Sequence, residues 1–430
     1  MGSNGRPCNV HRDKGETMRR FKQTFGMGLA VLLLLSIMLA GGVLAAGCGS
    51  DGGGGESGGE LVIGVDASMS GPLAGFGAYQ KWAIDKAVAE INDAGGLDVG
   101  GEMMTVKTIL YDNKSDPNVA SSNVDTLINK DGAIAIIGPV TPAVGNAAAL
   151  AAEKNGIPYL ETGNPIEPFV AVKADSGGWK YAFNFFVLAP PVAENAFKFP
   201  VDLGLETNMK TFISVDNSPD GPVFGPACEA AAEANGWEVV GMETHPASQT
   251  EFNSLISKMK ASGADYVYVL GDTPSFVALS KQMAAANYAP KILYYQRGAQ
   301  LQEFADAAGD LANGVTLEAY WLPTMPYPGA AELGAAYESA TGKKAGQILG
   351  PEYAAAQILT QAISRAGSTE PQAIVDALAA TDDTFVCGPV KFDENHTSAL
   401  NLVVAQWQDG TSQQIWPEGE GAVPAIFPMP

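Results

Sequence analysis

Residues 61–77 read LVIGVDASMSGPLAGFG, an apolar run rich in β-branched residues that ends in a turn of serine, glycine and proline. The run predicts a buried strand. A helix is predicted directly after the turn, because Ile84, Ala87, Val88 and Ile91 recur at helical spacing and share one face. Strand, turn and helix in this order form the repeating unit of an α/β fold.

The same unit recurs along the chain, and a new series starts after Pro190. Further apolar runs, each followed by an amphipathic stretch, lie at residues 104–112, 133–140, 157–161, 210–216, 237–243, 265–271 and 291–296. Strands that alternate with helices form parallel sheets covered on both faces. The sequence therefore predicts two successive α/β domains, each with a doubly wound parallel sheet.

The order of elements changes near Gly314. The strand-like run GVTLEAYWL is followed by helical stretches at residues 328–342, 350–366 and 371–380. The run that follows, CGPVKFDENHTSALNLVVAQWQDG at residues 387–410, alternates like a short β-meander.

The N-terminal segment has the layout of a secretory signal. A basic cluster at residues 18–22 precedes the apolar run 25–44, and small residues then lead to Cys48. A cysteine at this place resembles the lipobox of bacterial lipoproteins, in which the thiol receives a diacylglycerol and becomes the mature N-terminus. An uncleaved membrane anchor is the alternative, because roughly 20 apolar residues also span a bilayer. Translation is expected to start at Met18, within a signal segment that covers residues 1–47.

Residues 48–59 are expected to form a lipidated cysteine and a flexible tether, because glycine and serine have no side chain that packs. The rest of the chain, from residue 60 to Pro430, is long enough for two domains of ordinary size. Both interpretations of the N-terminal segment place this part outside the cytoplasm.

The composition argues against several classes of function. The chain holds 47 Asp and Glu against 25 Lys and Arg, a formal net charge of -22, so nucleic acid and anionic lipid are poor partners for its folded part. Cys228 and Cys387 follow Cys48 and are expected to stay unpaired. Residues 75–80 resemble a dinucleotide fingerprint, but Gln80 stands where the third glycine belongs. The sequence predicts no metal, no cofactor and no catalytic activity.

Ligands of parallel α/β sheets bind at the carboxyl ends of the strands, where loops lead into helix N-termini. The loops that follow the predicted strands are therefore the candidates for a binding site. They lie at residues 68–77, 138–142, 161–165, 216–221, 271–273 and 296–298.

Six motifs together resemble the leucine/isoleucine/valine-binding family of type I periplasmic binding proteins, which feed ABC transporters. They are MSGPLAGFG, YDNKSDP, IIGPVTPAVGNAAA, GIPYLET, DYVYVLG and VCGPVKFDE, in the family's order between Leu61 and Trp407. The resemblance implies the type I fold, in which two α/β lobes joined by three chain crossings close on a small molecule. The expected lobes are residues 60–186 with 317–402, and residues 187–316 with 403–430.

The resemblance also implies a binding site, and this sequence departs from the family there. Amino-acid binders of the family use a serine and a threonine after two strands of the first lobe to hold the ligand's carboxylate and amine. Pro142 and Pro165 occupy these places. We expect Thr141, Gly163 and Asn164 to supply the missing donors.

The second lobe departs further. Arg297 aligns with the glutamate that faces the ligand's ammonium in the family. A guanidinium there favours a carboxylate, so we expect Arg297 to bind one, with a merely solvated Arg297 as the alternative. Phe76 matches a position that packs on the ligand, and Val140 lies beside Thr141. Asp272 matches a pocket position from which it can accept a hydrogen bond from a ligand hydroxyl or amine, or it is simply solvated. Three further aromatic residues are assigned to the core and hinge: Phe183, Phe185 and Phe186.

The sequence thus predicts a non-enzymatic, extracytoplasmic solute-binding lipoprotein of an ABC importer. The expected partners are a small polar solute that bears a carboxylate, a membrane permease, and the membrane through a lipid on Cys48. The protein is expected to be monomeric. Binding of a branched-chain amino acid, or ligand sensing by a receptor of the same fold, are the alternatives.

Overall fold

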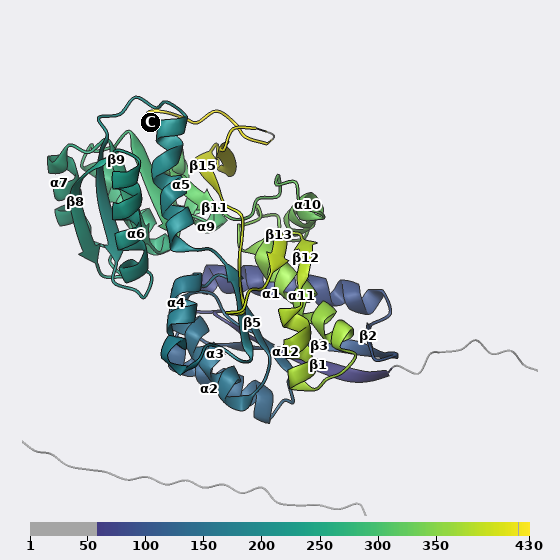
Figure 1. Cartoon of the computed structure of the whole chain (residues 1–430). Coiled ribbons are helices and arrows are strands. Elements are labelled where there is room, and N and C mark those ends of the chain that lie inside the picture. The colour runs from purple at the N-terminus through teal and green to yellow at the C-terminus, as the bar shows by residue number, and fades with distance from the viewer. Residues whose placement is uncertain (1–57, 420) are drawn as a thin grey trace, which may run out of the picture. The chain divides into compact units, whose positions relative to one another are not determined.

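Two α/β lobes, each built on one large sheet, form the protein (Figure 1). The structure is a computed structural model that describes residues 58–419 and 421–430. The predicted signal segment, Cys48 and the tether up to residue 57 lie outside these residues. The strand order is β14-β6-β5-β4-β1-β3-β2 in the sheet of lobe 1 and β16-β15-β11-β10-β9-β7-β8 in the sheet of lobe 2.

Lobe 1 is a largely parallel sheet with helices on both faces. Its strands are β1 (Gly58–Ala67), β2 (Leu97–Val99), β3 (Glu102–Asp112), β4 (Ala135–Ile137), β5 (Tyr159–Glu161), β6 (Ala182–Phe186) and β14 (Thr397–Ala399). Its helices are α1 (Ala74–Asp93), α2 (Pro117–Asn129), α3 (Pro142–Asn155), α4 (Ile166–Ala171), α11 (Leu349–Ala366) and α12 (Pro371–Ala379). Figure 1 shows the yellow-green α11 beside the purple α1, so a segment late in the chain completes lobe 1.

Lobe 2 repeats this design with an antiparallel edge. Its strands are β7 (Lys210–Asp216), β8 (Glu238–His245), β9 (Tyr266–Gly271), β10 (Ile292–Arg297), β11 (Thr316–Ala319), β15 (Val403–Gln408) and β16 (Thr411–Trp416). Its helices are α5 (Ala189–Asp202), α6 (Gly221–Ala234), α7 (Asn253–Ser262), α8 (Thr273–Ala285) and α9 (Gln302–Ala308). Every residue of β9 is buried, as expected of a central parallel strand.

The turn in residues 61–77 depends on one glycine. A Cβ atom on Gly77 would lie 2.2 Å from the carbonyl oxygen of Ser68, so only glycine lets α1 start this close to the end of β1. Behind β3, Asp116 caps α2 by accepting hydrogen bonds from the amides of Asn118 and Val119, and Pro117 occupies the first helical position. These local signals place the strand ends of lobe 1 beside the helix starts.

The chain passes between the two sheets after β6, β11 and β14, as the order of strands in the described residues shows. The predicted boundary at residue 317 is wrong, because β11 starts at Thr316 and pairs with β10 and β15 in lobe 2. Helix α10 (Ala330–Thr341) lies in the segment between β11 and α11, where Tyr337 stacks on Tyr79 of α1 at a centroid distance of 5.1 Å.

The predicted C-terminal meander is also wrong. The segment instead divides over three sheets: β12 (Asp382–Phe385) and β13 (Gly388–Lys391) form a hairpin, β14 pairs in parallel with β6, and β15 joins lobe 2. The tether is predicted two residues too long, because Gly58 already belongs to β1. Cys228 and Cys387 are buried and free. No helix within the described residues is long and apolar enough to span a membrane.

Candidate ligand-binding cleft

A cavity lies at the carboxyl ends of the strands and is lined by side chains of both lobes. The space between its lining residues, counted with its opening to solvent, is about 410 Å³. Its lining residues are Phe76, Val140, Thr141, Gly163, Pro165, Phe186, Val187, Asp220, Phe224, Leu270, Gln296, Arg297, Gln300, Glu318, Tyr320 and Ile348.

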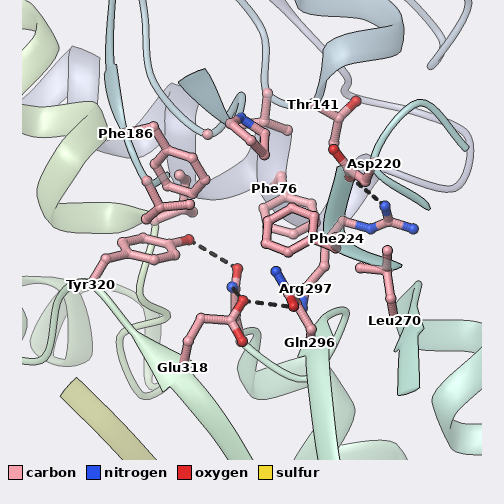
Figure 2. Close-up of a pocket in the computed structure, with 16 residues that line it drawn as sticks. Phe76, Thr141, Phe186, Asp220, Phe224, Leu270, Gln296, Arg297, Glu318 and Tyr320 are labelled. Carbon is pink, nitrogen blue, oxygen red and sulfur yellow. Dashed lines mark hydrogen bonds and ion pairs between the residues drawn. The ribbon is translucent and has the colours of Figure 1, made fainter. Parts of the chain in front are cut away.

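Most of the cavity wall is apolar. Phe76 of α1, Phe224 of α6 and Leu270 of β9 all line it (Figure 2). Phe186, at the end of β6, packs edge-on against Tyr320 with ring centroids 4.7 Å apart. Because β6 and β11 are each followed by a crossing between the lobes, this aromatic pair joins the wall of the cavity to the hinge.

Arg297 donates hydrogen bonds to three carboxylates of lobe 2. Its Nε donates to Asp272 at 3.0 Å, one terminal nitrogen donates to Asp220 at 2.5 Å and to Ser218 at 3.2 Å, and the other donates to Asp216. Burial opposes the charge, but Asp272, Asp216 and Asp220 outweigh it and hold the pKa of Arg297 above its ordinary value. Burial raises the pKa of Asp220, although Arg297 acts in the opposite direction.

This cluster removes the reason to expect a ligand carboxylate at Arg297. The guanidinium was expected to bind a carboxylate of the ligand, whereas each of its nitrogens already donates to a carboxylate of the chain. Arg297 does line the cavity, as its position after a strand predicts. The guanidinium and its three aspartates together carry net negative charge, which disfavours a second anion.

The opposite end of the cavity is formed by β11. Glu318 is 2% exposed and accepts hydrogen bonds from Gln300 Nε2 at 2.5 Å and from the Arg297 amide at 3.4 Å. Tyr320 donates from its hydroxyl to Gln300 Oε1 at 3.1 Å. Figure 2 shows Glu318 and Tyr320 at one end of the cavity and Thr141 and Asp220 at the other.

Three residues of the cavity wall each have a buried side-chain oxygen that lacks a hydrogen-bond partner among the described residues. These atoms are Oδ1 of Asp220, Oε1 of Gln296 and Oε2 of Glu318. The oxygen of Gln296 is an acceptor, and those of Asp220 and Glu318 are acceptors when these acids are ionised. Leaving such an atom unsatisfied typically costs about 1–3 kcal/mol. The wall therefore offers acceptors to a ligand that brings hydrogen-bond donors.

The structure places the sequence-predicted site residues unevenly. Phe76, Val140, Thr141, Gly163 and Arg297 all line the cavity. Thr141 and Arg297 both have φ of 73°, a conformation that is uncommon outside glycine and is often found at functional sites.

Two of the predicted site residues lie outside the cavity. Asn164 is fully buried behind it and donates to Glu161 at 2.6 Å and to Asn146 at 2.9 Å, so its amide protons are already used. Asp272 lines an adjoining hollow rather than the cavity itself and is occupied by Arg297. The prediction of a ligand contact therefore does not fit the position of either residue.

Phe186 and the polar residues of β11 were not predicted as site residues. Phe183 and Phe185 are buried core residues as expected, but Phe186 lines the cavity. Glu318 has a signal in the sequence, because it is an acid inside the apolar run GVTLEAYWL. In the described residues, no group of acidic, histidine and cysteine side chains could hold a metal ion.

Comparison with known proteins decides the family. The model of a family described as periplasmic binding protein matches residues 60–412. The chain belongs to this family. Leu/Ile/Val-binding protein homolog 8 of Brucella abortus is 30% identical over 372 residues, which cover 81% of this chain and 89% of that protein. Members of the family are periplasmic or extracytoplasmic solute-binding proteins.

Solved structures share the fold. The branched-chain amino acid transporter substrate-binding protein of Streptococcus pneumoniae, in complex with isoleucine, is 22% identical, covers 82% of this chain and 97% of its own, and has a TM-score of 0.72. A solute-binding protein of R. palustris, in complex with benzoate, is 20% identical with coverages of 85% and 98% and a TM-score of 0.70. These likenesses confirm a type I periplasmic binding protein fold with two α/β lobes.

Proposed function

We propose that this protein captures a small solute with an amino group and an apolar body and delivers it to an ABC importer. The observation that carries the proposal is the set of unsatisfied acceptor oxygens around an apolar cavity. A ligand amine supplies donors to the acceptors at the Glu318 end of the cavity, and its hydrocarbon part packs on the aromatic wall. Amino acids with an apolar side chain meet both requirements.

Charge supports the same class of solute. Glu318 is an acid of the cavity wall, and the guanidinium of Arg297 is outnumbered by its three aspartates, of which Asp220 also lines the cavity. A ligand carboxylate, where there is one, would lie toward Thr141 at the N-terminus of α3, where the helix dipole favours negative charge. An anion without an amine brings no donor to the free oxygens of the cavity wall.

Three ligands that share one hydrocarbon body test the proposal. They are L-leucine, its decarboxylated form 3-methylbutylamine, and its deaminated form 4-methylpentanoate. We expect the two amines to raise the melting temperature, since a ligand at a hundred times its dissociation constant adds about 2.7 kcal/mol to the native state. If only 4-methylpentanoate or benzoate raises the melting temperature, the proposal that the solute has an amino group is wrong, and a carboxylate solute is supported.

We further propose that Cys48 carries a lipid that keeps the protein near its permease. The support is the sequence, in which Cys48 follows an apolar run and small residues. Metabolic labelling with a clickable fatty acid should mark the protein but not Cys48→Ser. Cys8→Ser is the matched control, because Cys8 precedes the expected start at Met18 and its replacement should leave labelling unchanged. If Cys48→Ser is labelled as strongly as the unsubstituted protein, the proposal of a lipid on Cys48 is wrong.

A further inference from the structure

We infer that Glu318 is the specificity-determining residue of the cleft: its free carboxylate oxygen accepts the ligand's amino group, and its own proton leaves to solvent as the ligand binds. The inference rests on the proposed function and deepens it. Arg297 cannot take this role, because it is a cation that already donates to three aspartates. Glu318 lies on the neighbouring strand, β11.

One carboxylate oxygen of Glu318, a residue of the cavity wall, is left without a partner among the described residues. Oε1 is occupied by Gln300 and by the amide of Arg297, whereas Oε2 has no partner in the part of the chain that the structure describes. Figure 2 shows the carboxylate at the end of the cavity, beside Gln296 and below the aromatic rings. An ammonium group placed there would lie against an ionised oxygen in a site with little water, which strengthens the hydrogen bond.

The chain around Glu318 holds this carboxylate in place. Gln300 is itself fixed by the hydroxyl of Tyr320. Gln347, just before α11, donates to the backbone carbonyl of Glu318 at 3.0 Å and accepts from the amide of Tyr320 at 3.3 Å. Gln347 thereby connects the backbone at Glu318 to the segment that leads into α11 of lobe 1. The acceptor is therefore organised before the ligand arrives, which lowers the cost of binding.

The protonation state of Glu318 follows from its surroundings. Burial raises its pKa to about 8, although its hydrogen bonds and Arg297 act in the opposite direction. Burial also raises the pKa of the tyrosines and the cysteine nearby, so these groups stay neutral. In the described residues, the charge of Arg297 acts on Glu318, and the charge of Glu318 acts on Tyr266, Tyr268, Tyr294, Tyr320 and Cys228.

Binding is therefore linked to a proton. At neutral pH the ligand-free protein carries Glu318 largely as the acid, and an approaching ammonium group favours the carboxylate. The O–H bond of Glu318 breaks, the proton passes to solvent buffer, and a charge-assisted N–H···O bond forms with the ligand. Below pH 8, affinity for an amine should rise by up to ~10-fold per pH unit, and it should level off above pH 8.

Calorimetry with 3-methylbutylamine and L-leucine tests this link. Titrations at pH 6, 7 and 8, each in two buffers of different ionisation enthalpy, count the protons released. We expect release approaching one proton per ligand at pH 6 and 7 in the unsubstituted protein. Glu318→Gln should release none, lose the pH dependence and bind roughly 30-fold or more weakly.

Glu161→Gln is the matched control. Glu161 is a buried acid of lobe 1 with a similarly raised pKa, but it does not line the cavity. Its replacement should leave proton release and its pH dependence as in the unsubstituted protein. Amine binding without proton release, or a Glu318→Gln protein that keeps the pH dependence, would overturn the inference and leave the proposed function standing. If neither probe binds at any pH, the proposed function fails and the inference with it.

Discussion

At the scale of single residues, Arg297 holds several strand ends of lobe 2 together. It ends β10, and its partners Asp216 and Asp272 end β7 and follow β9. Asp216 is fully buried, so Arg297→Ala would strand it without its partner. Breaking a buried pair in this way typically costs about 3–5 kcal/mol.

Urea unfolding measures this loss. Lys258→Ala is the matched control, because Lys258 pairs with Glu243 on the surface and its loss should cost under ~1 kcal/mol. If Arg297→Ala loses no more unfolding free energy than Lys258→Ala, the cluster does not stabilise lobe 2.

Gly163 fixes the width of the cavity. Its φ is 79°, and a Cβ atom would lie 2.7 Å from Val140 Cγ1, a side chain of the cavity wall. Gly163→Ala should therefore cost backbone strain and also push Val140 into the ligand space, weakening ligand binding by roughly tenfold or more.

Gly177→Ala separates the two effects. Gly177 has φ of 87°, and nothing lies within 4 Å of its Cβ position. It should lose stability through strain and keep its ligand affinity. Calorimetry with L-leucine on both variants measures the affinities, and equal affinities would mean that Val140 yields without narrowing the site.

The sequence predicts the position of a site residue better than its bonding. Thr141, Gly163 and Arg297 line the cavity because loops after parallel strands meet at one edge of the sheet. The partners of Arg297 were not predicted, because Asp216 is 81 positions away in sequence and only the fold brings the two together. Glu318 was missed because it sits within a strand rather than in the loop behind one.

At the scale of elements, the end of β5 carries a buried acid with a proton. The hydroxyl of Tyr159 lies 3.1 Å from the carbonyl of Gly145 and 2.5 Å from Glu161 Oε2, but it has one proton to donate. A proton on Glu161 satisfies both contacts, because Glu161 then donates to Tyr159 and Tyr159 donates to Gly145. Burial correspondingly raises the pKa of Glu161 to about 8.

This proton makes stability depend on pH. Between pH 4.5 and 8 the folded chain keeps a proton on Glu161 that the unfolded chain loses, so the free energy of unfolding falls as pH rises. The fall is up to ~1.4 kcal/mol per pH unit. Glu161→Gln, whose amide can donate to Tyr159, should reduce this slope in urea unfolding at pH 5 to 8. Part of the slope should remain in Glu161→Gln, because burial also raises the pKa values of Asp66 and Glu318, to about 7 and about 8. An unchanged slope would contradict a buried proton on Glu161.

Elements with strong periodicity could be predicted from the sequence, and pairings between distant strands could not. The predicted helix at residues 350–366 is α11 with one residue added. The residues of β14 and β15 look like neighbours in a meander because they follow one another in sequence. Their partners β6 and β11 come from different lobes, a long-range choice that local alternation does not encode.

At the scale of the whole molecule, the cavity is shared by two lobes. Phe76, Val140 and Phe186 come from lobe 1, whereas Phe224 and Glu318 come from lobe 2. A ligand that touches both sets favours the closed arrangement, because only a difference in affinity between two states shifts their equilibrium. Family membership made the two lobes predictable from short motifs, while the ligand depends on side chains that differ from the family pattern.

Closure can be measured between exposed positions on the two lobes. Leu150 of α3 and Met242 of β8 are exposed, so spin labels on Leu150→Cys and Met242→Cys report the distance across the cleft. Cys228 and Cys387 are buried and should not react. Saturating L-leucine should shorten the distance between the two labels, as hinge closure requires. Double electron–electron resonance measures this distance. Labels on Leu150→Cys and Val172→Cys, both in lobe 1, should give an unchanged distance. L-leucine that binds by calorimetry but leaves the distance between the lobes unchanged would exclude hinge closure as the means of capture.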